Sequence, residues 1–257
     1  MIRTSRAGGV LTVVNDDPPT RNALSWDFYD GFREICEAAG DDPETRALVL
    51  TGAAGFFCSG GNVNGLRERS EADEATRRAS VERLHAMIRA MRACPRPIVA
   101  AVEGGAAGAG ASRALACDLI VAARDAYLSV AYVRIGLTPD GGATALLGAA
   151  LPRQLASEMV MTGDRVGMDR LHALGLVNRL TGPGEALGVA EALAARLADG
   201  PGEAIAAGKR LVGAATGAGF ERQLDLEADA IAAALGGPEG REGIAAFLGK
   251  RAPAWPR

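Results

Sequence analysis

The apolar residues of the first 190 positions fall into short continuous runs, separated by stretches with helical spacing. Such runs are typical of strands in a parallel sheet, which are buried on both faces. Between two of them, Phe28, Phe32 and Ile35 recur at helical intervals and predict a helix, with Ser25 as its N-cap. Strands alternating with helices indicate βαβ units. The expected strands are GVLTVVND (9–16), RALVLTG (46–52), PIVAAVEG (97–104) and CDLIVAAR (117–124).

A charged stretch, residues 66–93, interrupts this alternation. Its first half, 67–80, is polar on every side and predicts an exposed or mobile segment, whereas Leu84, Met87 and Met91 mark one face of a helix. Further on, an apolar run predicts a strand that carries Tyr132 toward a turn at Asp140.

The last part of the chain is helical. Gly and Pro separate runs with helical spacing, and helices are expected at 201–215, 219–235 and 240–249, with LVNRL (176–180) as a short strand before them. We therefore expect an α/β core over residues 1–190 and a helical region over residues 191–257.

The composition excludes several functional classes. The net charge is −3, and Lys and Arg are scattered, which argues against a nucleic-acid surface. Four cysteines without a CxxC pair and only two histidines predict neither a metal site nor a disulfide framework, and indicate a reducing, cytoplasmic location. The N-terminus has no apolar signal-like region, and no apolar run approaches the roughly 20 residues that span a bilayer. We expect no membrane partner.

Two glycine-rich turns follow expected strands: FFCSGGNV (56–63) and EGGAAGAGASRA (103–114). Neither has the spacing of a dinucleotide-binding or P-loop motif. Glycines before a helix leave backbone N–H groups unpaired and allow a ligand to approach closely. Two such turns side by side could direct two N–H groups at one oxygen, as in an oxyanion hole. Alternatively, the glycines serve only tight turns and close packing.

The order of five motifs resembles the crotonase superfamily, the enoyl-CoA hydratase and isomerase family. The resemblance runs from PTRNALS (19–25) to the end of the chain. It rests on FCSGGNV, AVEGGAAGAGASRALACDLIVAA, IGLTPDGG, EMVMTGDRV with LHALGLVNRL, and GIAAFLGKR. It implies a ββα spiral core, a C-terminal helical trimerisation region, an acyl-CoA substrate without a separate cofactor, and a homotrimer or a hexamer of paired trimers.

The resemblance also assigns residues. The two oxyanion donors fall on the amides of Gly61 and Ala109. Phe247 and Lys250 match residues that reach coenzyme A from a neighbouring subunit. The expected coenzyme A contacts are Thr20, Arg21, Ala23, Gly61, Asn62, Val63, Asn64, Ala109, Phe247 and Lys250.

The departures from the family pattern concern its acids. Hydratases of the family carry one glutamate three residues after the second oxyanion donor and another eight residues before the position of Asp140. Ser112 and Tyr132 stand there in this chain, and neither serves as a carboxylate base at neutral pH. Asp140 matches the single catalytic carboxylate of enoyl-CoA isomerases and of the phenylacetate-pathway ring isomerase. These matches favour an isomerase that uses Asp140; as a turn residue alone, Asp140 could instead cap the following helix.

Other interpretations remain open at this point. His85, Tyr132 and Asp140 resemble the His, Trp and Asp positions of an aryl-CoA dehalogenase, in which Asp attacks the ring and His activates water. His85 could equally be a partly buried helix residue, and Tyr132 could donate a hydrogen bond to Asp140. Arg113 stands where the family usually has an apolar residue. Enoyl-CoA hydratase, aryl-CoA or oxepin-CoA hydrolase, and a non-catalytic acyl-CoA- or RNA-binding paralogue are the alternatives to isomerisation.

Overall fold

The computed structural model describes residues 1–256, apart from the side chains of Val63 and Asn64. Within this part of the chain, six strands form the main sheet in the order β1-β2-β3-β4-β6-β9. β1 is antiparallel to β2, and all other neighbours are parallel. The strands are β1 (Ile2–Ala7), β2 (Val10–Asn15), β3 (Ala47–Gly52), β4 (Ile98–Val102), β6 (Leu119–Ala123) and β9 (Arg179–Thr181).

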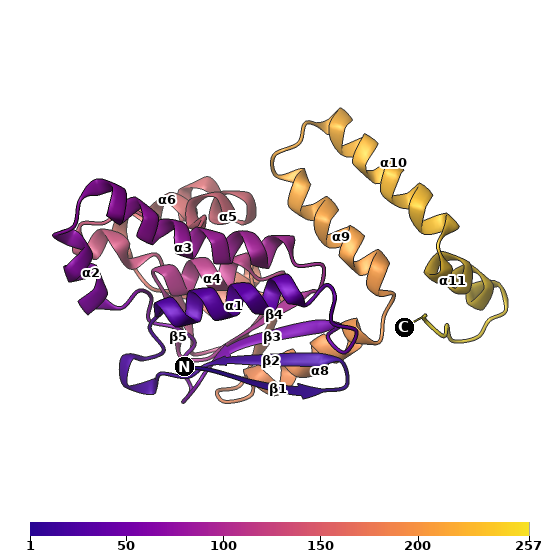
Figure 1. The fold of residues 1–257 in the computed structure, drawn as a ribbon, viewed down its shortest axis with the longest axis horizontal. Coiled ribbons are helices and arrows are strands. Elements are labelled where there is room, and N and C mark those ends of the chain that lie inside the picture. Colours follow the sequence, from indigo (N-terminus) through magenta and orange to yellow (C-terminus); the bar gives the residue numbers. More distant parts are fainter. Residues whose placement is uncertain (257) are drawn as a thin grey trace.

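Helices cover both faces of this sheet (Figure 1): α1 (Trp26–Ala38) and α3 (Glu74–Ala93) on one side, and α8 (Ala186–Ala198) on the other. Along β3, Leu48 and Leu50 belong to the apolar cluster that includes α1 and α3, while Val49 belongs to the cluster with α8. α8 presents alanines at every fourth position, such as Ala190 and Ala194, and small side chains allow a helix to lie close to a sheet. The uniformly apolar strands follow from this double coverage.

A second, smaller sheet lies at the carboxyl end of the main one. It consists of β5 (Gly105–Ala107), β7 (Tyr127–Ser129) and β8 (Val166–Gly167), with β5 parallel to β7. The remaining elements of the core are η1 (Pro18–Thr20), α2 (Val63–Ser70), α4 (Ala109–Ala116), η2 (Ala131–Ile135), α5 (Ala143–Ala150), α6 (Arg153–Thr162) and α7 (Met168–Ala173). The expected α/β fold is confirmed.

One expected strand is wrong. The segment that carries Tyr132 is not extended: β7 ends at Ser129, and η2 is a 3₁₀ helix closed by Gly136 in a left-handed conformation, with a φ of 71°. The stretch 67–80 is largely exposed, as expected, and it comprises the end of α2, a short connection at 71–73 and the start of α3. Asp73 begins α3 by accepting a hydrogen bond from the amide of Thr76 at 2.7 Å.

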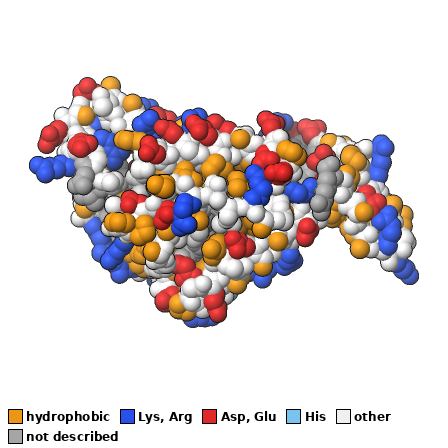
Figure 2. Space-filling model, turned by 60° about the horizontal axis from the view of Figure 1, so that its bottom comes forward, with side chains coloured by type: hydrophobic (Ala, Val, Ile, Leu, Met, Phe, Trp, Pro, Cys, Tyr) orange, Lys and Arg blue, Asp and Glu red, His pale blue; other side chains and the backbone are white. Residues whose placement is uncertain are grey.

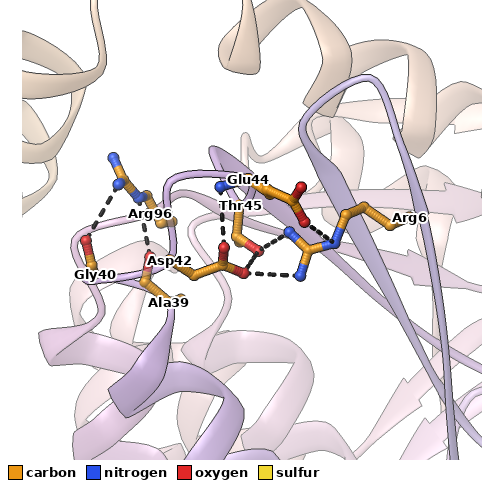
Figure 3. A network of polar contacts seen from close by, with 7 residues as sticks. All are labelled: Arg6, Ala39, Gly40, Asp42, Glu44, Thr45 and Arg96. Carbon is orange, nitrogen blue, oxygen red and sulfur yellow. Dashed lines mark hydrogen bonds and ion pairs between the residues drawn. The ribbon is translucent and has the colours of Figure 1, made fainter. Parts of the chain in front are cut away.

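The connection from α1 to β3 is held by a polar network (Figure 3). Arg6 of β1 donates to Thr45 at 2.8 Å and to Asp42 at 2.7 Å, and Asp42 also accepts from the hydroxyl of Thr45 and the amide of Glu44. These hydrogen bonds lower the pKa of Asp42 to about 2, and the one from the Thr45 hydroxyl has the largest effect. From the other side, Arg96 donates to the carbonyls that end α1.

The C-terminal helices are α9 (Gly202–Ala215), α10 (Phe220–Gly236) and α11 (Pro238–Leu248), close to the predicted ranges. They extend away from the core (Figure 1). The predicted division at residue 190 falls within α8, which packs on the sheet, and stays a prediction. None of the helices in residues 1–256 is both long and apolar enough to cross a membrane. Acidic and basic side chains are interspersed over the face shown in Figure 2.

Candidate active site

The two glycine-rich turns lie against each other. β3 and β4 are neighbours in the main sheet, so the turns that follow them emerge at the same edge. The turns are joined by backbone hydrogen bonds: the amide of Cys58 donates to Gly105 at 3.2 Å, and the amide of Ala107 donates to Cys58 at 3.0 Å. The pairing anticipated from the sequence is therefore present, and it brings residues 58–61 beside the start of α4.

Glycine is required where the turns approach each other. Gly60 has a φ of 106°, and a Cβ there would lie 2.9 Å from the carbonyl oxygen of Ala107 and 3.7 Å from the amide nitrogen of Ala109. Gly108, with a φ of 50°, precedes the first residue of α4. Among the described residues, neither Gly61 nor Ala109 donates its amide hydrogen to another group of the chain. Both amides are free to bind an oxygen of a ligand.

Asp140 lies in a hydroxyl network beside the second turn. The Tyr132 hydroxyl donates to a carboxylate oxygen of Asp140 at 2.5 Å and lies 3.1 Å from the hydroxyl of Ser112. Ser112 in turn donates to the backbone carbonyl of Asp140 at 2.9 Å. A Cβ on Gly108 would lie 4.0 Å from the Tyr132 ring, so this network adjoins the turn that precedes Ala109. The two positions that lack the hydratase glutamates thus both hold Asp140: Tyr132 binds its carboxylate, and Ser112 binds its backbone carbonyl.

The carboxylate of Asp140 does not cap the following helix. The N-cap of α5 is Gly142, and no side chain caps that helix end. Only the backbone carbonyl of Asp140 takes part, by accepting from the amide of Ala143 at 3.2 Å. The capping interpretation of Asp140 therefore fails.

The surroundings of Asp140 favour its protonated form. Burial raises its pKa above the ordinary aspartate value, and the Tyr132 hydrogen bond, His85 and Arg69 oppose that rise in decreasing order. No ion pair is formed by Asp140 within the described part of the chain. A half-buried carboxylate with a raised pKa is better suited than an ordinary aspartate to accept a proton and to return it.

Three side chains around Asp140 come from other elements. His85 of α3 is half-buried and has its Nδ1 3.5 Å from Glu82. Tyr29 of α1 is 5 % exposed; burial raises the pKa of its hydroxyl, and the negative charge of Asp140 raises it further. The sequence analysis did not identify Tyr29 or Arg69. Tyr29 belongs to the apolar pattern of its helix, and Arg69 lies in a stretch whose polar pattern predicts a solvent-exposed segment.

Several expected coenzyme A contacts lie beside the first turn. The amide of Ser59 donates to Arg21 at 3.0 Å and its hydroxyl donates to Thr20 at 2.8 Å, while the amide of Ala23 donates to the Thr20 hydroxyl at 3.1 Å. Asn62 is half-buried near the start of α2. A cavity of about 390 Å³ opens here, lined by Pro18, Arg21, Asn22, Ala53, Ala54, Gly55 and Phe56. The side chains of Val63 and Asn64 lie outside the described residues.

Phe247 and Lys250 are not brought to this site within the chain. Phe247 is 83 % exposed on α11, and Lys250 follows the end of that helix with a φ of 50°. Figure 1 places α11 beyond α9 and α10, away from α4.

No metal centre is formed by residues 1–256, leaving aside the undescribed side chains at 63 and 64: no three His, Cys, Asp or Glu side chains gather closely enough. All four cysteines are free and buried. A second cavity, of about 420 Å³, contains none of the predicted site residues. It is lined by Arg134, Glu158, Met159, Thr162, Asp164, Arg165, Val166 and Arg170.

Comparison with known proteins places this chain in one family. Residues 5–257 match the model of the family described as enoyl-CoA hydratase/isomerase. The chain is 32 % identical over 246 residues to the 1,2-epoxyphenylacetyl-CoA isomerase of Escherichia coli (strain K12), covering 95 % of this chain and 94 % of that protein. It is 31 % identical over 249 residues to the 2,3-dehydroadipyl-CoA hydratase of the same organism, covering 97 % and 96 %.

A solved structure agrees with this assignment. An enoyl-CoA hydratase from Polaromonas sp. JS666 superimposes with a TM-score of 0.96 at 42 % identity, covering 99 % of both chains. The two sheets, the paired glycine-rich turns and these similarities lead to one conclusion: the chain belongs to the enoyl-CoA hydratase/isomerase family of the crotonase superfamily.

Proposed function

We propose that this protein isomerises an acyl-CoA thioester by moving a proton from one carbon to another, with Asp140 as both base and acid. The observation that carries the proposal is the Asp140 carboxylate, half-buried, hydrogen-bonded to Tyr132, and unused as a helix cap. The similarity to a 1,2-epoxyphenylacetyl-CoA isomerase supports the same reaction class.

The reaction begins with proton removal. The Asp140 carboxylate takes a proton from the carbon next to the thioester carbonyl, and the electrons of that C–H bond move into the carbonyl, giving an enolate. The protonated Asp140 then returns the proton to the γ-carbon. The enolate collapses back to a thioester, and the double bond moves from the β,γ to the α,β position. No atom is gained or lost, so one carboxylate is sufficient.

The amides of Gly61 and Ala109 hold the enolate oxygen in this proposal. Neither amide donates a hydrogen bond within the described residues, and the turns that carry them are in contact. Both observations support that role. Donors held in place before the charge develops stabilise the enolate without reorganisation. Because every step passes through the same oxyanion, the hole serves double-bond shifts and aromatic ring isomerisation alike.

Water addition is the alternative that relatives of this chain suggest, since a hydratase is among them. It requires a group that activates water in addition to one that delivers a proton. Ser112 and Tyr132 hold those positions here and are bonded to each other and to Asp140. Hydration of crotonyl-CoA is therefore expected to be slow or undetectable.

The assembly and the rest of the coenzyme A site follow the family pattern in this proposal. Exposed large apolar side chains on the C-terminal helices support a homotrimer or a pair of trimers, in which Phe247 and Lys250 of a neighbouring copy meet the coenzyme A held near Thr20, Arg21 and Ala23. Examples of these exposed side chains are Val212, Phe220, Ile231, Leu235, Phe247 and Leu248. The coenzyme A thioester is the substrate, and no further cofactor is required. A cytoplasmic location stays a prediction from the sequence.

The test is a panel of 2-enoyl-, 3-enoyl- and arylacetyl-CoA esters incubated with wild-type protein in D₂O and, separately, in H₂¹⁸O. Mass spectrometry then separates proton movement from water addition. We expect deuterium in the acyl group, a moved double bond and no ¹⁸O.

Each rival has its own signature. Rapid incorporation of ¹⁸O with retention of the thioester would indicate a hydratase. Release of free coenzyme A with ¹⁸O in the acid would indicate hydrolysis by Asp140 with His85. Absence of any change in every ester would favour a non-catalytic binding protein.

A further inference from the structure

Arg113 is the largest side chain that is completely buried, with 0 % of its surface exposed. It lies on α4, four residues after Ala109. The amide of Ala109, the first residue of this helix, is a proposed oxyanion donor. Burial within the chain itself excludes a pairing with an acid across a subunit contact. The role of this residue must come from what surrounds it inside the core.

The guanidinium group is held by aromatic rings and one carbonyl. Its carbon lies 4.7 Å from the centre of the Phe28 ring and 4.5 Å from that of the Phe57 ring, and its Nη2 donates to the carbonyl of Phe57 at 3.1 Å. Nε and Nη1 have no hydrogen-bond partner among the described residues. No carboxylate within that part of the chain forms an ion pair with Arg113.

Stability does not explain this arrangement. A buried charge without a counter-charge costs folding free energy, and replacement by apolar residues is often neutral or stabilising. Contacts with the two rings offset part of the cost, and burial lowers the pKa of Arg113, but an arginine keeps its proton in proteins. An uncompensated cation in the core therefore suggests a role in the chemistry.

The position of Arg113 relates it to both halves of the oxyanion hole. Phe57, which accepts its hydrogen bond, begins the first glycine-rich turn, and α4 continues the second. The two are packed so closely that a Cβ on Gly110 would lie 2.6 Å from the carbonyl oxygen of Cys58 and 2.8 Å from its sulfur. Through its hydrogen bond to the Phe57 carbonyl, Arg113 of α4 links the first turn to the helix that continues the second.

We propose that Arg113 is a positioning residue of the oxyanion hole: it ties the first turn to α4, and its unpaired positive charge favours the enolate oxygen between Gly61 and Ala109. This inference rests on the proposed function. In a dry interior a charge is weakly screened and acts over several ångströms. The positive end of the α4 dipole, at the N-terminus of the helix, likewise favours a negative charge there. The substrate enolate would be the counter-charge that the core lacks.

The test compares Arg113→Met, which keeps the unbranched stem and removes the charge, with Arg113→Lys, which keeps a charge. Arg78→Met, at an exposed position of α3, is the matched control. The kinetic readout is deuterium exchange from D₂O into the CoA ester that wild-type protein exchanges fastest. We expect Arg113→Met to unfold at a temperature no lower than wild type and to bind the ester within about 3-fold. We expect its exchange to be at least ~10-fold slower.

The second readout is spectroscopic. The absorbance of 4-dimethylaminocinnamoyl-CoA moves to longer wavelength when its thioester carbonyl is polarised. At pH 6, where a buried lysine is more readily protonated, we expect a large shift with wild type and Arg78→Met, a smaller one with Arg113→Met, and partial recovery with Arg113→Lys. Asp140→Asn should keep the full shift, because it leaves the hole intact, while losing exchange.

The outcomes separate the two proposals. Arg113→Met with the exchange rate and absorbance shift of wild type would overturn the role of Arg113 and leave the proposed function standing. Absence of a shift with wild type would also overturn it, since no polarising hole would exist. Asp140→Asn with the wild-type exchange rate would overturn the proposed function, whatever Arg113 does.

Discussion

Two buried regions of this molecule each contain one acid and one cation, and they use them differently. At the junction of α9 with the core, Lys209 and Asp118 are 2.8 Å apart, and Lys209 also donates to two backbone carbonyls. In the candidate active site, Asp140 is held by the hydroxyl of Tyr132, and Arg113 by one carbonyl and two rings. Neither Asp140 nor Arg113 forms an ion pair among the described residues.

The difference indicates which buried charges hold the fold together. The pKa of Asp118 is raised by burial, but Lys209 opposes the rise and the amide of Ile98 donates to the same carboxylate at 2.8 Å. That pair fixes α9 to the sheet. In the roles proposed above, Asp140 carries a proton and Arg113 faces the negative charge of the enolate, so neither is expected to hold elements of the fold together. Loss of the first pair should therefore affect stability, and loss of the second pair should affect turnover.

The largest expected effect is on the structural pair. Lys209→Met leaves Asp118 buried without its counter-charge, which should lower the free energy of unfolding by about 3–5 kcal/mol. Urea denaturation at pH 7 measures this loss. The double variant Lys209→Met/Asp118→Leu should regain much of it, because no unpaired charge remains. A single variant as stable as wild type would remove the contrast between the two regions.

The next effect concerns the second oxyanion donor. Ala109 is the first residue of α4, where proline fits a helix and has no N–H to donate. Ala109→Pro should reduce turnover by ~10²- to 10³-fold while the folded protein keeps its stability. Ala109→Gly, which retains the amide, is the control and should keep most activity. Equal turnover in the two variants would show that the amide of Ala109 is not a donor.

A smaller effect follows from the hydroxyl network. The Tyr132 hydrogen bond lowers the pKa of Asp140 against the rise caused by burial. Tyr132→Phe removes that bond, so the pKa of Asp140 should rise further. A base works only when deprotonated, so the acidic limb of the pH–rate profile should move to higher pH. A limb that stays in place or moves to lower pH would contradict this coupling.

The smallest effect is expected at His85. His85 is half-buried at the edge of the site and lies beside Glu82. This environment is typical of a supporting side chain. His85→Asn should change maximal turnover by no more than about 2-fold, the size typical of substitutions away from critical contacts. Steady-state kinetics at pH 8 provide the measurement. A loss of ~10²-fold would instead favour the hydrolytic mechanism with His85 as the base.

Much of the fold could be predicted from the sequence because its signals are local. Continuous apolar runs predicted β2, β3, β4 and β6, and Ser25 caps α1 through the amide of Phe28 at 3.2 Å as expected. The prediction for the segment around Tyr132 was wrong because a short apolar run can form a 3₁₀ helix as well as a strand. Its conformation is set by packing on α6 and by the left-handed turn at Gly136.

The candidate site was predictable only where a motif marks it. Ser112, Tyr132 and Asp140 occupy positions defined by spacing, and the chain brings all three together. The unpaired state of Arg113 could not be predicted, because it depends on three elements packing around one helix position. Tyr29 also approaches Asp140 only through the packing of α1, and no local signal distinguishes it from other core residues.

The most direct test of Asp140 as a proton carrier pairs it with Asp118, the half-buried aspartate of the structural pair. Asp140→Asn and Asp118→Asn each replace a carboxylate by an amide of the same size, and exchange of deuterium from D₂O into the CoA ester is measured per folded protein. Burial raises the pKa of Asp140, so its ionised form costs stability at neutral pH. Asp140→Asn should therefore be at least as stable as wild type at pH 7. That advantage shrinks as pH falls through the raised pKa of Asp140 and is gone below about 4, the ordinary aspartate value, where the carboxyl is protonated in both the folded and the unfolded state.

The two variants should diverge in opposite directions. Asp140→Asn is expected to lose ~10²-fold or more of the exchange rate with its stability intact, because no cation is left unpaired by the change. Asp118→Asn is expected to lose stability, because it leaves Lys209 in the core without its counter-charge, while its folded fraction exchanges at the wild-type rate. Wild-type exchange by Asp140→Asn would contradict the assignment of this carboxylate as the acid and base of the site.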